Sequence, residues 1–102
     1  MSWLIGGGCD NVTTVEVKDR KKNGEDMVLV DVRTPAERAS RKIDGSKHIP
    51  LQELDGRAAE LPRDRELVIY CQNGIRSIMA CRILKQKGFT QVKNLEGGIN
   101  RW

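Results

Sequence analysis

The 102-residue chain has few of the residues from which metal, nucleic-acid and membrane sites are built. It contains one histidine, three cysteines, two tryptophans, one tyrosine and one phenylalanine. A single histidine, with cysteines that never show C-x-x-C spacing, does not make a zinc site, so we expect no metal and no cofactor. So few aromatic side chains do not form the stacking surface of a single-strand nucleic-acid binder. No run of about 18 apolar residues is present, and we expect no membrane-spanning helix.

The three cysteines, Cys9, Cys71 and Cys81, are an odd number and do not indicate a disulfide framework. The first residues, Met-Ser-Trp-Leu-Ile-Gly, lack the basic region and the long apolar run of a secretory signal peptide. We therefore expect a cytoplasmic protein that is not built on a disulfide scaffold. On this interpretation Cys9 is a bystander near the terminus and Cys81 is a small core residue.

Charge and length describe one small domain with a mild basic surplus. Lysine and arginine number 18 against 14 acidic residues, which gives a net charge of +4. A surplus of this size helps to attract a small anion or keeps the protein in solution. We expect residues 11–102 to form the domain and residues 1–10 to be an N-terminal extension whose structure the sequence does not specify.

Short apolar runs alternate with short helical patterns along the whole chain. Strands are predicted over residues 27–32, 47–50, 66–70 and 92–95, helices over 15–22, 35–40, 51–61 and 76–87, and residues 3–5 are a candidate for one more strand. The main apolar runs are continuous, which is typical of strands covered on both faces. The order predicts a three-layer α/β fold, with a mostly parallel sheet of about five short strands between helices.

Helix starts and one helix face are also predicted. Thr13 or Thr14 is the expected N-cap of the first helix, and Glu16, three residues after Thr13, fits a capping box. Thr34 before Pro35 is a typical helix start. For the helix over 76–87 we expect a buried stripe made of Ile75, Met79, Ala80, Ile83 and Leu84.

Cys71 stands at the junction of a strand, a loop and a helix. It follows the apolar run 66–70 and precedes the helix that starts near Arg76. At such a junction backbone N–H groups and the helix dipole favour an anion, so a thiolate is stabilised. Asp31 ends another strand, and in parallel sheets ligands bind beyond the carboxyl ends of strands. We therefore predict that Cys71 is a nucleophile and shares a rim with Asp31.

The loop after Cys71 has the composition of an anion-binding nest. Gly74 permits a backbone conformation that turns successive N–H groups inward, and Arg76 adds a permanent cation. Asp31 is interpreted as a structural anchor for Arg33 on the same rim. The predicted substrate-binding residues are Gln72, Asn73, Gly74, Ile75, Arg76 and Ser77.

Four segments, in this order, resemble the single-domain rhodaneses, a sulfurtransferase family. They are Val30–Glu37, Ile43–Leu51, Val68–Ser77 and Gly88–Trp102, within a resemblance that covers roughly residues 12–102. The resemblance implies a rhodanese-like fold and a thiosulfate sulfurtransferase. Cys71 would take a sulfur from thiosulfate or a related donor, become a persulfide, and pass the sulfur to cyanide or a thiol. It also implies a small anionic sulfur donor and a thiol or protein sulfur acceptor as partners.

Three positions depart from the family pattern, and two other functions stay open. Arg38 stands where an aromatic residue is common, and Lys42 and Asp44 replace the usual His and Pro. Cysteine-dependent phosphatases and arsenate reductases share the fold, but their loop has one more residue than the four between Cys71 and Arg76, which favours sulfur as the cargo. Non-catalytic binding modules on this fold commonly lack the cysteine that this chain has.

Overall fold

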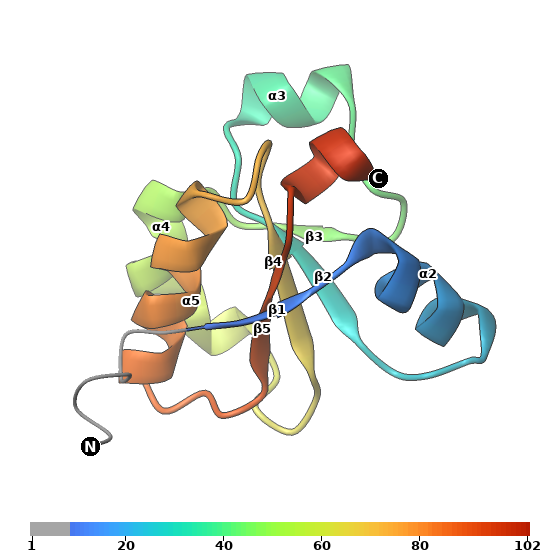
Figure 1. Ribbon diagram of the computed structural model, residues 1–102. Helices are drawn as coiled ribbons and strands as arrows, with labels where there is room; N and C mark the ends of the chain where they lie inside the picture. Colours follow the sequence, from blue (N-terminus) through green and yellow to red (C-terminus); the bar gives the residue numbers. More distant parts are fainter. Residues whose placement is uncertain (1–8) are drawn as a thin grey trace.

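Five short parallel strands form a central sheet in the computed structural model, which describes residues 9–102 (Figure 1). The strands are β1 Asp10–Val12, β2 Val28–Asp31, β3 Lys47–His48, β4 Leu67–Tyr70 and β5 Val92–Leu95, in the order β1-β5-β4-β2-β3. The helices are α2 Thr14–Lys22, α3 Pro35–Ser40, α4 Leu51–Arg57 and α5 Arg76–Gln86, with 3₁₀ turns η1 Ala58–Glu60 and η2 Gly98–Arg101. The predicted α/β fold with a parallel sheet is confirmed.

Strand β4 is buried on both faces because helices cover both sides of the sheet. Its side chains alternate between the two faces. Leu67 and Ile69 pack with side chains of α4 and α5 in one apolar core. Val68 and Tyr70 pack in a second core, together with Val17 of α2. The continuous apolar run that predicted this strand therefore reflects a real two-sided core.

Two helices begin with the predicted capping residues. Thr13 caps α2 and Thr34 caps α3, each in a capping box with the glutamate three residues later. Glu16 and Glu37 thus return a carboxylate to the first turn of their helices, which also suits the helix dipole. The longest helix described, α5, has 11 residues. None of the helices within residues 9–102 is both long and apolar enough to cross a membrane.

Strand β1 lies where the sequence predicted no strand. Residues Asp10–Val12 pair in parallel with Lys93–Leu95 at one side of the sheet. Only Val12 of the three is buried, so this strand has no apolar run to mark it. The expected domain start at residue 11 falls inside β1, and the candidate strand at residues 3–5 lies outside the described residues.

The predicted buried stripe of α5 is wrong at two positions. Ile75 and Met79 have exposed fractions of 69% and 56%. The face turned to the sheet instead carries Ser77, Ala80, Cys81 and Leu84. Small side chains on this face let the helix lie close to the sheet, whereas two long apolar ones would hold it away.

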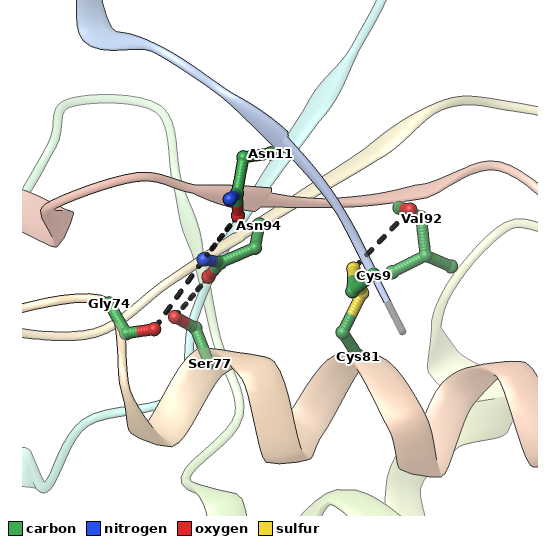
Figure 2. The surroundings of a disulfide bond; sticks show 7 residues. All are labelled: Cys9, Asn11, Gly74, Ser77, Cys81, Val92 and Asn94. Carbon is green, nitrogen blue, oxygen red and sulfur yellow. Dashed lines mark hydrogen bonds between the residues drawn. A yellow bond between two sulfur atoms is a disulfide. The ribbon is translucent and has the colours of Figure 1, made fainter. Parts of the chain in front are cut away.

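A disulfide bond joins Cys9 to Cys81 (Figure 2). The prediction that Cys9 is a bystander is therefore wrong, and Cys81, although buried as expected, is bonded to it. The two Cα atoms lie 6.1 Å apart, across 72 positions of sequence. The sequence positions of the cysteines could not reveal this pairing. It depends on β1 lying beside β5, on the side of the sheet that α5 covers.

Breaking the Cys9–Cys81 bond is expected to lower the free energy of unfolding by about 2–4 kcal/mol, because a long cross-link removes entropy from the unfolded chain. Denaturant unfolding of a Cys71→Ser chain, with and without reductant, measures the difference in the absence of the free thiol. Cys9→Ala in the same background is the control, and it should unfold at the lower midpoint under both conditions. An unchanged midpoint of the Cys71→Ser chain on reduction would contradict the expectation.

Candidate functional site

The loop from β4 to α5 lies at the carboxyl end of the sheet. Figure 1 shows α3 and the C-terminal turn η2 at the same end of the molecule. Strands β2 and β4 are neighbours, and Asp31 pairs in register with Tyr70, the residue before Cys71. The expectation that Asp31 and Cys71 share one rim is confirmed.

The Cys71 sulfur accepts hydrogen bonds from two backbone amides of the loop. Gly74 N lies 3.1 Å and Ser77 N lies 3.4 Å from Sγ, and Ser77 Oγ is also 3.4 Å away. No side chain caps α5 at Ile75, so the sulfur takes the place of a capping oxygen at the start of this helix. Cys71 is fully buried, and it is the free thiol among the three cysteines of the chain.

The surroundings of the sulfur favour its ionised form. Burial raises the pKa of the Cys71 thiol, but hydrogen bonds from the Ser77 hydroxyl and from the amides of Ser77, Gly74 and Asn73 lower it. The hydrogen bonds outweigh burial, and the pKa lies below the ordinary value of a cysteine. A thiol of this kind is a better nucleophile near neutral pH than an ordinary buried cysteine.

Glycines let the C-terminal turn lie directly on the loop. Gly74 has φ +95°, and a Cβ there would stand 3.1 Å from Gly97 N. Gly98 has φ +61°, and a Cβ there would stand 2.5 Å from the Cys71 carbonyl oxygen. This close approach allows Ile99 N to donate to the Cys71 carbonyl at 2.9 Å. The turn η2 therefore holds the loop in the conformation that directs its amides to the sulfur.

The side chains of Gln72 and Asn73 brace the loop and do not contact the sulfur. Gln72 accepts from Arg33 Nη1 at 3.2 Å and donates to Asn100 Oδ1 at 2.6 Å. Asn73 Oδ1 accepts from Ile75 N at 3.2 Å. Of the six predicted substrate-binding residues, Gly74 and Ser77 donate hydrogen bonds to Sγ, and the Asn73 backbone amide also lowers the pKa of Cys71.

Arg76 is held by a carboxylate from α3. Its two terminal nitrogens donate to the two carboxylate oxygens of Glu37 at 2.8 and 2.7 Å. This pairing, with the hydrogen bonds from Thr34, holds the pKa of Glu37 at about 2 in spite of some desolvation. The sequence predicted that Arg76 attracts an anion and did not predict its pairing with Glu37. The Arg76 side chain keeps an exposed fraction of 37% and so remains accessible to solvent.

Asp31 and Arg33 form a buried ion pair behind the loop. The exposed fractions of their side chains are 0% and 1%. Arg33 donates from Nε and Nη2 to the two oxygens of Asp31, each at 2.9 Å, and Tyr70 adds its hydroxyl at 3.1 Å. Burial raises the pKa of Asp31, but Arg33 and Tyr70 bring it below the ordinary value. Through Gln72 this pair reaches the loop, which agrees with the structural role predicted for Asp31 and Arg33.

Arg38 and Lys42, two positions that depart from the family pattern, lie in different surroundings: Arg38 contacts the buried ion pair, whereas Lys42 is exposed. Arg38 donates to Asp31 Oδ2 at 3.2 Å and to Ser46 Oγ at 3.0 Å, so it extends the buried pair to the segment before β3. Lys42 is exposed and is not among the residues that contact the loop. No three histidine, cysteine, aspartate or glutamate side chains within residues 9–102 gather closely enough to hold a metal ion.

Asn94 is a site residue that the sequence analysis missed. The Ser77 hydroxyl donates to Asn94 Oδ1, and Asn94 Nδ2 donates to Asn11 Oδ1 at 3.0 Å (Figure 2). Asn94 is buried inside β5, at an exposed fraction of 2%. The sequence offered no clear signal for this residue, because β5 also carries Lys93 and does not form an apolar run.

Comparison with known proteins gives a consistent group of relatives. A family model described as "Rhodanese-like domain" matches residues 13–102. A sulfurtransferase of Allochromatium vinosum is 41% identical over 93 residues, which span 91% of this chain and 87% of that protein. The structure of the human single-domain sulfurtransferase TSTD1 is 28% identical with a TM-score of 0.82, covering 93% of this chain and 96% of that one. An NAD-dependent persulfide reductase from A. fulgidus is 42% identical with a TM-score of 0.66, covering 85% of this chain but 18% of the larger protein.

Removing the charge of Asp31 is expected to destabilise the fold by about 3–5 kcal/mol, because Asp31→Asn leaves the buried Arg33 cation without its carboxylate. The matched control is Asp26→Asn, which removes an exposed carboxylate paired with Arg65 and should cost less than about 1 kcal/mol. Denaturant unfolding near neutral pH measures both.

The pH dependence of the Asp31→Asn effect has a defined sign. The folded pKa of Asp31 is depressed, so its stabilising charge is fully present above the unfolded value of about 4 and is lost as the pH falls through the folded pKa. The difference between the parent protein and Asp31→Asn should therefore shrink in acid. Equal losses for Asp31→Asn and Asp26→Asn at neutral pH would rule out the buried pair as a major source of stability.

Proposed function

The chain belongs to the rhodanese-like sulfurtransferase family, and we propose that it moves a sulfane sulfur from thiosulfate or a related donor to a thiol or cyanide through a persulfide on Cys71. The observation that carries the proposal is a free thiol at a helix N-terminus, hydrogen-bonded by the amides of Gly74 and Ser77. Those amides stabilise the thiolate that the first step requires.

The first half-reaction loads the enzyme. The Cys71 thiolate attacks the outer sulfur of thiosulfate, a bond forms from Sγ to that sulfur, and the S–S bond of thiosulfate breaks. Sulfite leaves with the bonding electron pair, and the negative charge of the enzyme now rests on the outer sulfur of the persulfide. We expect amides of the loop between Gln72 and Ser77, those of Gly74 and Ser77 first, to donate hydrogen bonds to this anion. Since Cys71 is fully buried, the donor reaches Sγ only when atoms at the loop mouth give way.

The second half-reaction restores the thiolate. A thiol, acting as thiolate, or a cyanide ion attacks the outer sulfur, and the bond from Sγ to that sulfur breaks. Cys71 leaves with the electron pair and returns to its starting state. The covalent intermediate divides one difficult transfer into two easier displacements. A low-pKa thiol is also the better leaving group, so the amides that help the first step help this one.

Arg76 is proposed to guide the anionic donor to the loop. Its guanidinium lies at the start of α5, five positions after Cys71, and carries a permanent charge. Glu37 neutralises part of that charge and fixes the side chain in one direction. In this proposal the ion pair sets a moderate attraction for anions, so that sulfite is also able to leave.

The reaction is proposed to take place in the cytoplasm, with a small anionic sulfur donor and a thiol or protein acceptor. The Cys9–Cys81 disulfide is uncommon for a cytoplasmic protein, and reductants of that compartment act on accessible disulfides. Cys81 is fully buried, which shields one sulfur of this bond from direct attack.

Incubation with thiosulfate is expected to add the mass of one sulfur atom to the folded protein, because Cys71 is its free thiol. Intact-mass measurement across a panel of thiosulfate, an organic persulfide and a persulfidated protein reads out the donor. Cys71→Ser should gain nothing, while cyanide or a thiol should remove the sulfur from the loaded parent protein.

The same preparations separate the alternatives. No mass gain with any donor, in a chain shown to be folded, would sink the sulfurtransferase proposal. Turnover of an aryl phosphate that disappears in Cys71→Ser would favour the phosphatase interpretation. Neither activity, together with an ordinary Cys71 pKa, would indicate a binding module.

Substitutions at the Arg76–Glu37 pair are expected to move KM in opposite directions. Arg76→Ala should raise KM for thiosulfate about three- to tenfold, since ~1 kcal/mol of attraction is lost at a partly exposed site. Glu37→Gln should lower it by a similar factor, because the amide releases Arg76 yet still serves the capping box at Thr34. Steady-state kinetics measures both, with kcat nearly unchanged.

The control for this pair is Arg57→Ala, which removes the same charge from an ion pair on α4. It should leave KM within about twofold of the parent value, since exposed charges away from the loop are screened by salt. If Arg57→Ala and Arg76→Ala raise KM equally, the guiding role belongs to the overall charge of the protein and not to Arg76.

A further inference from the structure

A short row of polar side chains crosses from the sulfur to the edge of the sheet. Figure 2 shows Ser77 of α5, Asn94 of β5 and Asn11 of β1 in line, beside the disulfide bond. Ser77 is fully buried and Asn94 nearly so, while Asn11 at the far end is exposed. Each hydrogen bond in this buried row constrains the next one, so the row affects which hydrogen bonds the Cys71 sulfur can accept.

The orientation of the Asn94 amide follows from its neighbours. Asn94 Nδ2 lies 3.0 Å from Asn11 Oδ1 and 3.5 Å from the carbonyl oxygen of Gly74. A backbone carbonyl only accepts hydrogen bonds, so the amide nitrogen must face Gly74. Asn94 Oδ1 is thereby turned to Ser77, and the Ser77 hydroxyl must be the donor of their hydrogen bond.

The Ser77 hydroxyl has one proton and two neighbours that compete for it. Its oxygen lies 3.4 Å from Cys71 Sγ as well as within hydrogen-bond distance of Asn94 Oδ1. While the proton points to Asn94, the hydroxyl presents lone pairs to the sulfur and accepts from a thiol S–H. To stabilise a thiolate, the hydroxyl must rotate and leave Asn94 Oδ1 without its donor.

The charge on Sγ changes between the states of the proposed cycle. It is negative in the thiolate, but in the persulfide Sγ is neutral and the charge lies on the outer sulfur. A hydroxyl proton is therefore needed at Sγ in one state and not in the other. Asn94 Oδ1 is the acceptor within reach of that proton in the neutral state.

We propose that Asn94 is a positioning residue that holds the Ser77 hydroxyl proton while Cys71 Sγ is uncharged and releases it to Sγ when the thiolate forms. The role of Asn94 in the thiol and the thiolate follows from the geometry alone. Its role in the persulfide rests on the proposed function. Because the Asn94 acceptor is satisfied only when Sγ is neutral, Asn94 disfavours the thiolate and favours both the thiol and the persulfide. Asn94 thereby lowers the free energy of the persulfide form relative to the thiolate form.

The main test replaces Asn94 by leucine, which is similar in size and has no acceptor. Titration of the thiolate by its ultraviolet absorbance, with Cys71→Ser as the blank, gives the Cys71 pKa without a reagent having to reach the buried sulfur. Asn94→Leu should lower this pKa by about 0.5–1 unit, which is about three- to tenfold more thiolate at a given pH well below it. Asn94→Asp keeps an acceptor for the hydroxyl and should not lower the pKa.

A double-mutant cycle shows whether Asn94 acts through Ser77. Ser77→Ala should raise the Cys71 pKa, because the thiolate loses a donor. Adding Asn94→Leu to Ser77→Ala should then change nothing further. The proposal is overturned if Asn94→Leu leaves the pKa unchanged or raises it, or if it lowers the pKa equally in the absence of the Ser77 hydroxyl.

Folding and function are checked separately. Thermal unfolding verifies each variant, and Asn94→Val, a residue suited to a strand, replaces the leucine variant if that chain does not fold; the same shift is expected. Since the titration uses no sulfur donor, its outcome stands even if the protein takes up no sulfur. In the persulfide arm, the loaded fraction at a fixed ratio of thiosulfate to sulfite should fall about three- to tenfold in Asn94→Leu, and an unchanged fraction in a parent protein that does load would overturn that half.

Discussion

Two backbone N–H groups that meet at one sulfur atom are the interaction on which the rest of the site depends. The amides of Gly74 and Ser77 reach Cys71 Sγ because Gly74 adopts a left-handed conformation and α5 begins just after it. Neither amide belongs to a side chain, so truncating a side chain does not remove these two donors. What the sequence can specify is the backbone path, and the contacts around the loop hold that path in place.

That path is held from three sides by parts of the chain that are distant in sequence. The turn η2 donates to the carbonyls of Cys71 and Gln72, the Arg33 guanidinium holds the Gln72 side chain, and Glu37 holds Arg76. The buried Asp31–Arg33 pair explains why a charged residue is tolerated so near a core strand: each charge is matched and the remaining donors of Arg33 reach carbonyl oxygens. Rigid support of this kind matters more for a nucleophile than any single contact, because the reacting atoms must meet at a short distance and a narrow angle.

Local features of this chain could be predicted from sequence, and pairings across the sheet could not. The run Leu67–Tyr70, the capping boxes at Thr13 and Thr34, and the place of Cys71 before a helix are all encoded within a few residues. The Cys9–Cys81 bond, the partner of Arg76 and the buried face of α5 each depend on which elements lie side by side. The error on α5 has a simple cause. Apolar residues were counted as core, although small residues face the sheet here and Ile75 and Met79 face outward.

The order of strands, β1-β5-β4-β2-β3, determines which contacts must form before the surroundings of the Cys71 sulfur are complete. Strand β4 is central, and its two neighbours come from segments before and after it in the chain, so its pairing requires contacts that are distant in sequence. The amides that activate Cys71 are close to it along the chain, but Asn94, Ile99 and Glu37, which complete its surroundings, arrive only with those distant contacts. The complete surroundings of the sulfur therefore exist only in the assembled sheet, so Asn94, Ile99 and Glu37 can act on Cys71 only in the folded protein.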